Sequence, residues 1–183
     1  MVTKRGIQYI PAIDGLRAIA VIAVMLYHLG VSWIPGVFLG VDLFFVISGY
    51  VITRLLLDSI QERGGLDLRD FYLARIRRLL PPLVFMIVTT SIFIGLWAPD
   101  TTKKFLTDAP FSLTGAMNWW LVLNNQDYFE AIGRPPLLQH TWSLAVEAQF
   151  YLLWPLILLI VLKYLGKKLI PAAALIIAAT SGV

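Results

Sequence analysis

The chain has 183 residues, of which 58% are hydrophobic and only 14% charged, and its net charge is +4. Soluble domains carry about 25% charged residues, so this composition indicates an integral membrane protein and excludes an ordinary soluble domain. The absence of cysteine excludes disulfides, thiolate metal sites and a cysteine nucleophile. The two histidines are too far apart for a zinc motif, so no metal site is expected. The basic residues flank apolar segments, which favours membrane orientation over nucleic-acid binding.

Apolar segments predict four complete membrane spans, at residues 11–31, 37–54, 79–98 and 141–162. A further apolar segment at 169–183 is too short to span comfortably, and we expect it to be part of a fifth span. The predicted fold is therefore an all-α polytopic transmembrane helical bundle. It is expected to be truncated, with residues 1–183 forming the N-terminal part of a longer membrane domain.

The segment between the second and third spans, residues 55–78, is expected to be cytoplasmic. It contains an amphipathic piece, a break at Gly64–Gly65 and the basic run ARIRR. The Pro81–Pro82 pair that follows suits the start of the third span, because the first turn of a helix tolerates a missing N–H.

The apolar segment 109–125 is interrupted by small and amide residues, and two placements are open for it. If it is re-entrant or interfacial, 11 of the 15 Lys and Arg residues are cytoplasmic and three are external. If it spans the membrane, nine of these basic residues are cytoplasmic and five are external. The positive-inside rule favours the first placement and a cytoplasmic N-terminus.

Two ionisable residues, Arg17 and His28, lie in the first span with ten residues between them. Eleven positions are about three helical turns, so both side chains leave the same face, roughly 16 Å apart along the axis. Placing an ionisable group inside a membrane is costly, by at least ~2.5 kcal/mol for Arg. Such residues are therefore usually functional. This pair is therefore a predicted functional site.

In the preferred topology His28, Asp42 and Glu147 fall near the outer boundary of their spans. An imidazole oriented by a carboxylate can deprotonate a hydroxyl group, and such catalysis contributes roughly 10²–10⁴-fold. We predict His28 as a general base, with Asp42 or Glu147 orienting it. The alternative is that the two carboxylates only form hydrogen bonds between helices.

At the inner side, Arg75 and Arg78 share one helical face, while Arg77 points elsewhere. Paired guanidinium groups suit bidentate capture of phosphate oxygens. Because the intramembrane Arg17 lies on the same side, we predict that Arg75 and Arg78 form a phosphate-ligand site. The alternative is ordinary anchoring by positive charge at the inner surface.

Four runs of sequence follow one another along the chain: IDGLRAIAVIAVMLYH, GVDLFFVISGYVI, FYLARIRRLLPP and LLQHTWSLAVEAQFYLLWP. Together they resemble the acyltransferase type 3 family of membrane O-acyltransferases. The arginine–ten residues–histidine motif of that family falls on Arg17 and His28. Its arginine–two residues–arginine motif falls on Arg75 and Arg78, and its first glutamate in the SLxVEEQFY block falls on Glu147.

The sequence departs from the family pattern at Ala148, where a second glutamate is common, and in having about half the expected spans. The resemblance implies acyl transfer, with acetyl-CoA or another acyl-CoA as donor substrate and no permanently bound cofactor. It implies a hydroxyl of an envelope polysaccharide or related glycan as acceptor. The expected location is the bacterial inner membrane, with further C-terminal spans of the same protein as partners.

Two alternatives belong to other functional classes. In a proton-coupled transporter or flippase of an envelope precursor, Arg17, His28 and Glu147 would form a pathway through the membrane. Such transporters tend to show repeated halves, and this sequence shows no internal repeat. A membrane scaffold without chemistry would leave the pairing of Arg17 with His28 unexplained.

Overall fold

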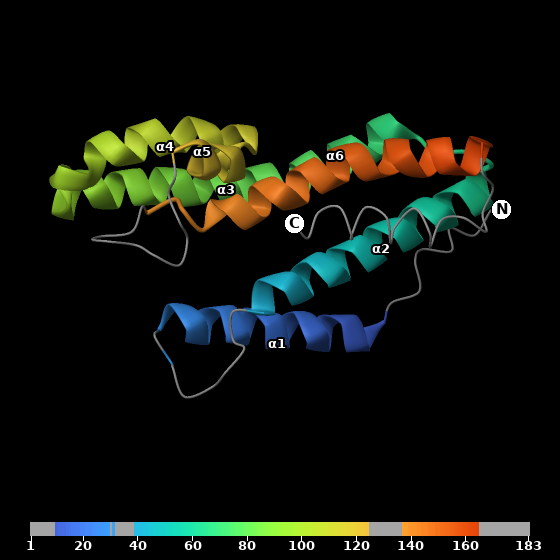
Figure 1. Cartoon of the computed structure of the whole chain (residues 1–183), viewed down its shortest axis with the longest axis horizontal. Helices are drawn as coiled ribbons and strands as arrows, with labels where there is room; N and C mark the ends of the chain where they lie inside the picture. The colour runs from blue at the N-terminus through green and yellow to red at the C-terminus, as the bar shows by residue number, and fades with distance from the viewer. Residues whose placement is uncertain (1–9, 30, 32–38, 125–136, 165–183) are drawn as a thin grey trace. The chain divides into compact units, whose positions relative to one another are not determined.

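The computed structural model of the chain describes residues 10–29, 31, 39–124 and 137–164. Within these residues every regular element is helical, and four helices are long and apolar enough to cross a bilayer (Figure 1). They are α1 (Pro11–His28), α2 (Gly40–Arg63), α3 (Leu68–Trp97) and α6 (Thr141–Tyr164). The predicted all-α membrane fold is thereby confirmed. The chain divides into two compact units, Met1–Asp67 and Leu68–Val183.

The first unit is an antiparallel pair of helices, α1 and α2 (Figure 1). The two helices approach closely at Gly40, where a Cβ atom would lie only 2.8 Å from the carbonyl oxygen of Ala20. Ala20 is itself fully buried. Close contact between backbones therefore fixes how the two helices pack.

Two predicted spans are parts of longer helices. The second span, expected at 37–54, continues as α2 to Arg63, because no helix breaker precedes Gly64. Gly64 then ends the helix with a φ of +71°, the left-handed conformation that glycine adopts at low cost. The expected break at this glycine is confirmed.

The prediction that Pro81 and Pro82 lie at the start of their helix is wrong. Helix α3 begins at Leu68, and both prolines lie inside it. The segment before them is rich in leucine and arginine, which are good helix formers, so the helix starts well before the apolar stretch. Neither proline can donate to the carbonyl four residues earlier, which belongs to Arg77 for Pro81 and to Arg78 for Pro82.

The second unit contains α3 and the elements that follow it. A 3₁₀ turn, η2 (Pro99–Thr101), leads from α3 into α4 (Thr102–Thr114), α5 (Met117–Leu123) and α6. A buried apolar core joins these helices. Its members are Ile94, Phe105, Met117, Leu121, Leu138 and Ala145. At its edge the rings of Phe111 and Trp120 stack with centroids 4.1 Å apart.

The described part of the segment 109–125, residues 109–124, is not one helix. Gly115, with a φ of +69°, separates the 13-residue α4 from the seven-residue α5. Neither helix reaches the ~20 residues that a transmembrane helix needs. The re-entrant or interfacial placement of this segment stays a prediction. The predicted partial span at 169–183 lies outside the described residues.

Candidate active site

A cavity of about 450 Å³ opens in the second unit. Its walls are side chains from residues 72–83 of α3, 112–115 at the end of α4, and 144–152 of α6. Most of the lining is leucine and alanine, and Arg75 is the charged residue in it. Ligand sites commonly combine an apolar wall of this kind with a few polar groups.

Arg75 enters the cavity between two aromatic rings. Its guanidinium carbon lies 5.4 Å from the ring centroid of Phe71 and 5.7 Å from that of Tyr151, distances typical of cation–π contacts. The Nε atom of Arg75 is buried and has no hydrogen-bond partner among the described residues. A buried donor without an acceptor is costly, so an acceptor from a ligand would stabilise this side chain.

Glu147 lies on α6 one turn before Tyr151. The phenol of Tyr151 donates a hydrogen bond to the carboxylate of Glu147, and this carboxylate also attracts the Arg75 guanidinium. The structure thus brings together two predicted site residues, Glu147 and Arg75, that the sequence placed at opposite ends of the membrane.

Arg78 differs from Arg75 in its surroundings. It lies one turn later on α3, is exposed, and is close enough for the two positive charges to repel each other. Two cations held on one face favour binding of an anion between or beside them. Arg78 does not line the cavity, so the two arginines occupy different environments despite their shared motif.

A polar network fixes the turn between α4 and α5 beside the cavity. The side-chain amide of Gln149 donates to the carbonyl oxygen of Gly115 at 2.9 Å and to Oδ1 of Asn118 at 2.9 Å. Asn118 donates back to Gln149 at 3.3 Å. These contacts secure α5 against α6, so Gly115 has a defined place in the cavity wall.

A second polar pair ties α4 to α5. The indole Nε1 of Trp120 donates to Oδ1 of Asp108 at 2.9 Å, and Asp108 is almost completely buried. Burial raises the pKa of Asp108, while the bond from Trp120 and the positive charge of Lys104 lower it by less. Asp108 is thus a buried acid outside the predicted spans.

Sequence reasoning missed Tyr151, Gln149 and Asn118. The signal for Tyr151 was its position four residues after Glu147, which places the two on one helical face. The partnership of Gln149 with Asn118 depends on how α5 folds against α6, so it leaves no mark in the local sequence.

The other predicted site residues, Arg17, His28 and Asp42, lie in the first unit. Nδ1 of His28 lies 2.8 Å from the carbonyl oxygen of Val24. A carbonyl can only accept, so Nδ1 carries the proton and Nε2 is the basic nitrogen of the neutral ring. This tautomer suits the predicted role of His28 as a base.

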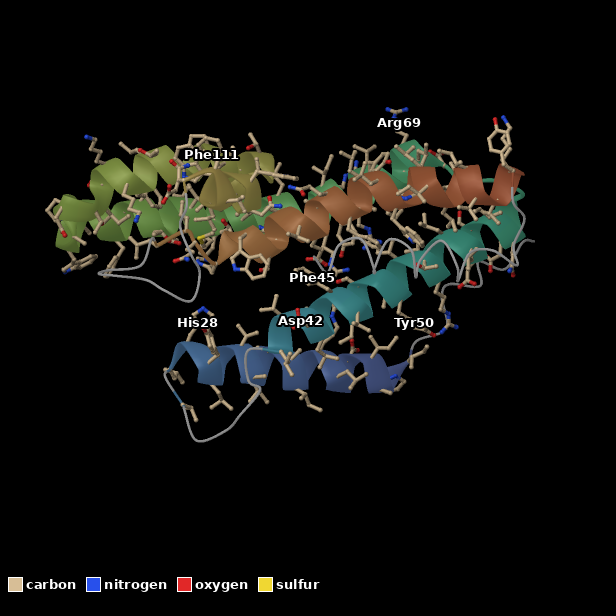
Figure 2. The ribbon with its side chains drawn as sticks, viewed as in Figure 1. His28, Asp42, Phe45, Tyr50, Arg69 and Phe111 are labelled. Atoms are coloured by element: carbon tan, nitrogen blue, oxygen red, sulfur yellow. The ribbon has the colours of Figure 1, made fainter. Side chains whose placement is uncertain are left out.

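Asp42 does not lie at the level of His28 within the helix pair. Gly40 meets α1 between Ala20 and Val24, and Asp42 lies two residues further along α2. At 1.5 Å per residue this separates Asp42 from His28 by roughly 10 Å along the axis. Figure 2 shows His28 at the end of α1 and Asp42 nearer to its middle. The helix pair therefore does not favour Asp42 as the group that orients His28.

Comparison with known proteins identifies the family of this chain. Residues 10–183 match the family model described as an acyltransferase domain. The chain is 46% identical over 162 residues to the peptidoglycan O-acetyltransferase OatA of Listeria monocytogenes, covering 88% of this chain and 26% of that protein. It is 44% identical over 169 residues to the putative peptidoglycan O-acetyltransferase YrhL of Bacillus subtilis, covering 92% of this chain and 26% of that protein.

The O-acetyltransferase OatA of Staphylococcus aureus is 44% identical over 151 residues, covering 82% of this chain and 25% of that protein. The chain thus spans about a quarter of the length of these curated relatives. No solved structure matches. The match to the family model covers almost the whole chain, including all four candidate spans, and the chain therefore belongs to the acyltransferase domain family.

Proposed function

We propose that the chain is part of a membrane O-acyltransferase that moves an acyl group from acyl-CoA to a hydroxyl of an envelope glycan. The observation that carries this proposal is the cavity in which Arg75 has an unpartnered Nε beside the Glu147–Tyr151 pair. All three relatives are named O-acetyltransferases, which supports acetyl as the acyl group. The Listeria protein is named a peptidoglycan O-acetyltransferase and the Bacillus protein a putative one, which supports a cell-wall glycan as the acceptor.

On this proposal the donor approaches from the side of the membrane where α3 begins. Arg78, exposed one turn beyond Arg75, binds phosphate oxygens of the donor. Arg75 contacts the donor at the cavity, and Arg17 helps to position its pantetheine arm or carbonyl group. The excess of basic residues in the loops on that side supports a cytoplasmic N-terminus in the bacterial inner membrane.

The chemical step joins the acceptor oxygen to the thioester carbonyl carbon. His28 takes the hydroxyl proton on Nε2, since Nδ1 is engaged with Val24. The carbon–sulfur bond breaks, and coenzyme A leaves as the thiolate, which is later protonated. Glu147 is the proposed carboxylate for this step, because the helix pair does not favour Asp42 as the group that orients His28.

The test is transfer of radiolabelled acetyl from acetyl-CoA to envelope glycans, in membranes that contain the whole gene product. We expect His28→Ala to lose transfer, and Arg78→Ala to lose most of it when acetyl-CoA is held below the wild-type KM. Arg77→Ala is the matched control, because it removes a cation from the same basic run. Full transfer by His28→Ala would contradict the proposed base, and no transfer by the wild type would contradict acetyl-CoA as donor.

A further inference from the structure

The cavity in the second unit is long and graded in polarity. Its wall on α3 runs from Tyr72 to Leu83, which is about 16 Å along the helix axis. Arg75 and the two tyrosines, Tyr72 and Tyr151, lie toward one end. Beyond them the wall is mainly leucine, isoleucine, alanine and glycine. The two hydroxyl groups in this part of the wall already have partners, since Ser112 is hydrogen-bonded to Thr141 and Thr114 donates to the carbonyl oxygen of Pro110. A ligand that fits this cavity has a polar head and an extended apolar tail.

Two small residues, Gly115 and Ala148, lie close to each other in the wall of the cavity. A Cβ atom on Gly115 would lie 3.6 Å from the Cβ atom of Ala148. The left-handed φ of Gly115 favours glycine, so a larger side chain at 115 is disfavoured by the backbone as well. Ala148 occupies a position where the acyltransferase type 3 family often has glutamate. This part of the wall is therefore apolar in this chain.

The head of the ligand must supply an oxygen acceptor. Nε of Arg75 is buried without a hydrogen-bond partner among the described residues, and aromatic rings cover the guanidinium on two sides. A carbonyl oxygen held at Nε would complete its hydrogen bonding while the rest of the molecule extends along the leucines. This combination of charge and shape fits a thioester carbonyl followed by a hydrocarbon chain.

We infer that this cavity is the acyl-chain site of the donor, and that Ala148 with Gly115 sets the chain length it accepts. The inference rests on the proposed function and narrows it to donors whose acyl chain enters the second unit. The cavity then accepts chains longer than acetyl.

The test measures binding of acetyl-, butyryl-, hexanoyl- and octanoyl-CoA to the whole purified gene product in nanodiscs. Wild-type affinity is expected to rise with chain length, by at most about fourfold per added methylene. In Ala148→Leu, affinity for octanoyl-CoA should fall at least ~10-fold, while affinity for acetyl-CoA stays within about twofold. Ala74→Leu, at an exposed position on α3 outside the cavity, is the matched control.

A second variant guards against misfolding of Ala148→Leu. Leu83→Ala enlarges the far end of the cavity and should shift the preference toward octanoyl-CoA. Equal affinities for all four donors, or an unchanged preference in both variants, would overturn the inference. Binding that depends on chain length without any acyl transfer would instead contradict the proposed function alone.

Discussion

Tyr151 donates the hydrogen bond from its phenol to Glu147, one helical turn earlier on α6. The same tyrosine presents its ring to the guanidinium of Arg75 on α3. One side chain therefore holds a carboxylate on its own helix and faces a cation on a second helix that is remote in sequence. This makes Tyr151 a positioning residue for the proposed reaction.

Tyr151→Phe separates these two roles, because phenylalanine keeps the ring but loses the hydroxyl group. We expect the rate of acyl transfer to fall about tenfold or more, since a hydrogen bond to a charged group contributes about 1.5–3 kcal/mol. The KM for the donor should stay unchanged, because Arg75 keeps its aromatic neighbour. Steady-state kinetics separate kcat from KM.

Tyr72→Phe is the control for that substitution, since it removes another phenol of the cavity, which donates to the carbonyl oxygen of Leu152 at 3.0 Å. It should leave kcat almost unchanged. Equal kcat values for Tyr151→Phe and the wild type would refute the positioning role.

Arg75 and Arg78 are expected to recognise different parts of the donor. Arg78→Ala should raise the KM for acetyl-CoA about tenfold or more, but leave transfer from the acetyl thioester of N-acetylcysteamine, which lacks phosphates, unchanged. Arg75→Ala should impair transfer from both donors, because Arg75 lines the cavity. The same proportional loss with both donors in Arg78→Ala would show that Arg78 does not bind phosphate.

Asp108 predicts a dependence of stability on pH. Burial raises the pKa of this carboxyl above its ordinary value of 3.8. The folded state therefore holds the proton more tightly, and the stabilisation is complete below pH 3.8 and is lost as pH rises through the folded-state pKa. Asp108→Asn cannot ionise and keeps an oxygen for Trp120. The Tm of Asp108→Asn should therefore increase relative to the Tm of the wild type as pH rises from 4 to 7. Thermal unfolding of both proteins, measured at intervals of about one pH unit, tests this.

Asp108→Ala checks the origin of that gain. It also removes the charge but leaves the Trp120 indole without its acceptor, so its Tm should lie below that of Asp108→Asn at every pH. A difference between Asp108→Asn and the wild type that is constant with pH would argue against titration of Asp108 as the cause.

Gly40→Ala is predicted to destabilise the pairing of α1 with α2. The added methyl group would lie 2.8 Å from the Ala20 carbonyl oxygen and 3.0 Å from side-chain carbons of Ala23 and Val24. Overpacking of this kind costs about 1–3 kcal/mol, which should lower the Tm of the purified protein. In Gly15→Ala, the control on α1, the new methyl group has open space. Its Tm should stay the same or rise, and an equal fall in both variants would contradict the packing argument.

Most of the fold could be predicted from sequence because bilayer thickness sets a minimum length for an apolar helix. Helix ends were harder to predict. The amphipathic residues before Gly64 and the arginines before Pro81 continue the helices of the spans beside them, although neither segment is apolar enough to look like a span. Backbone hydrogen bonding extends a helix beyond its hydrophobic part, and hydropathy does not record this.

The candidate site was predictable residue by residue but not as an arrangement. Arg75 and Glu147 stand out as charges beside or within apolar segments. Their proximity depends on α3 and α6 packing in opposite directions, which brings the early turns of α3 beside the later turns of α6, as the bond between Tyr72 and Leu152 shows. The depth of each residue in its own predicted span could not reveal this, because the predicted start of α3 was wrong.

The prolines of α3 and α6 have a mechanical consequence for the cavity. Pro81 and Pro82 lie at the level of its Leu83 end, and Pro155 lies just past its Leu152 end. Each proline removes one backbone hydrogen bond, so each helix has its softest point beside one end of the cavity. The two walls can therefore bend there independently, and the stiffness of the core around Met117 does not fix the width of the cavity at its ends.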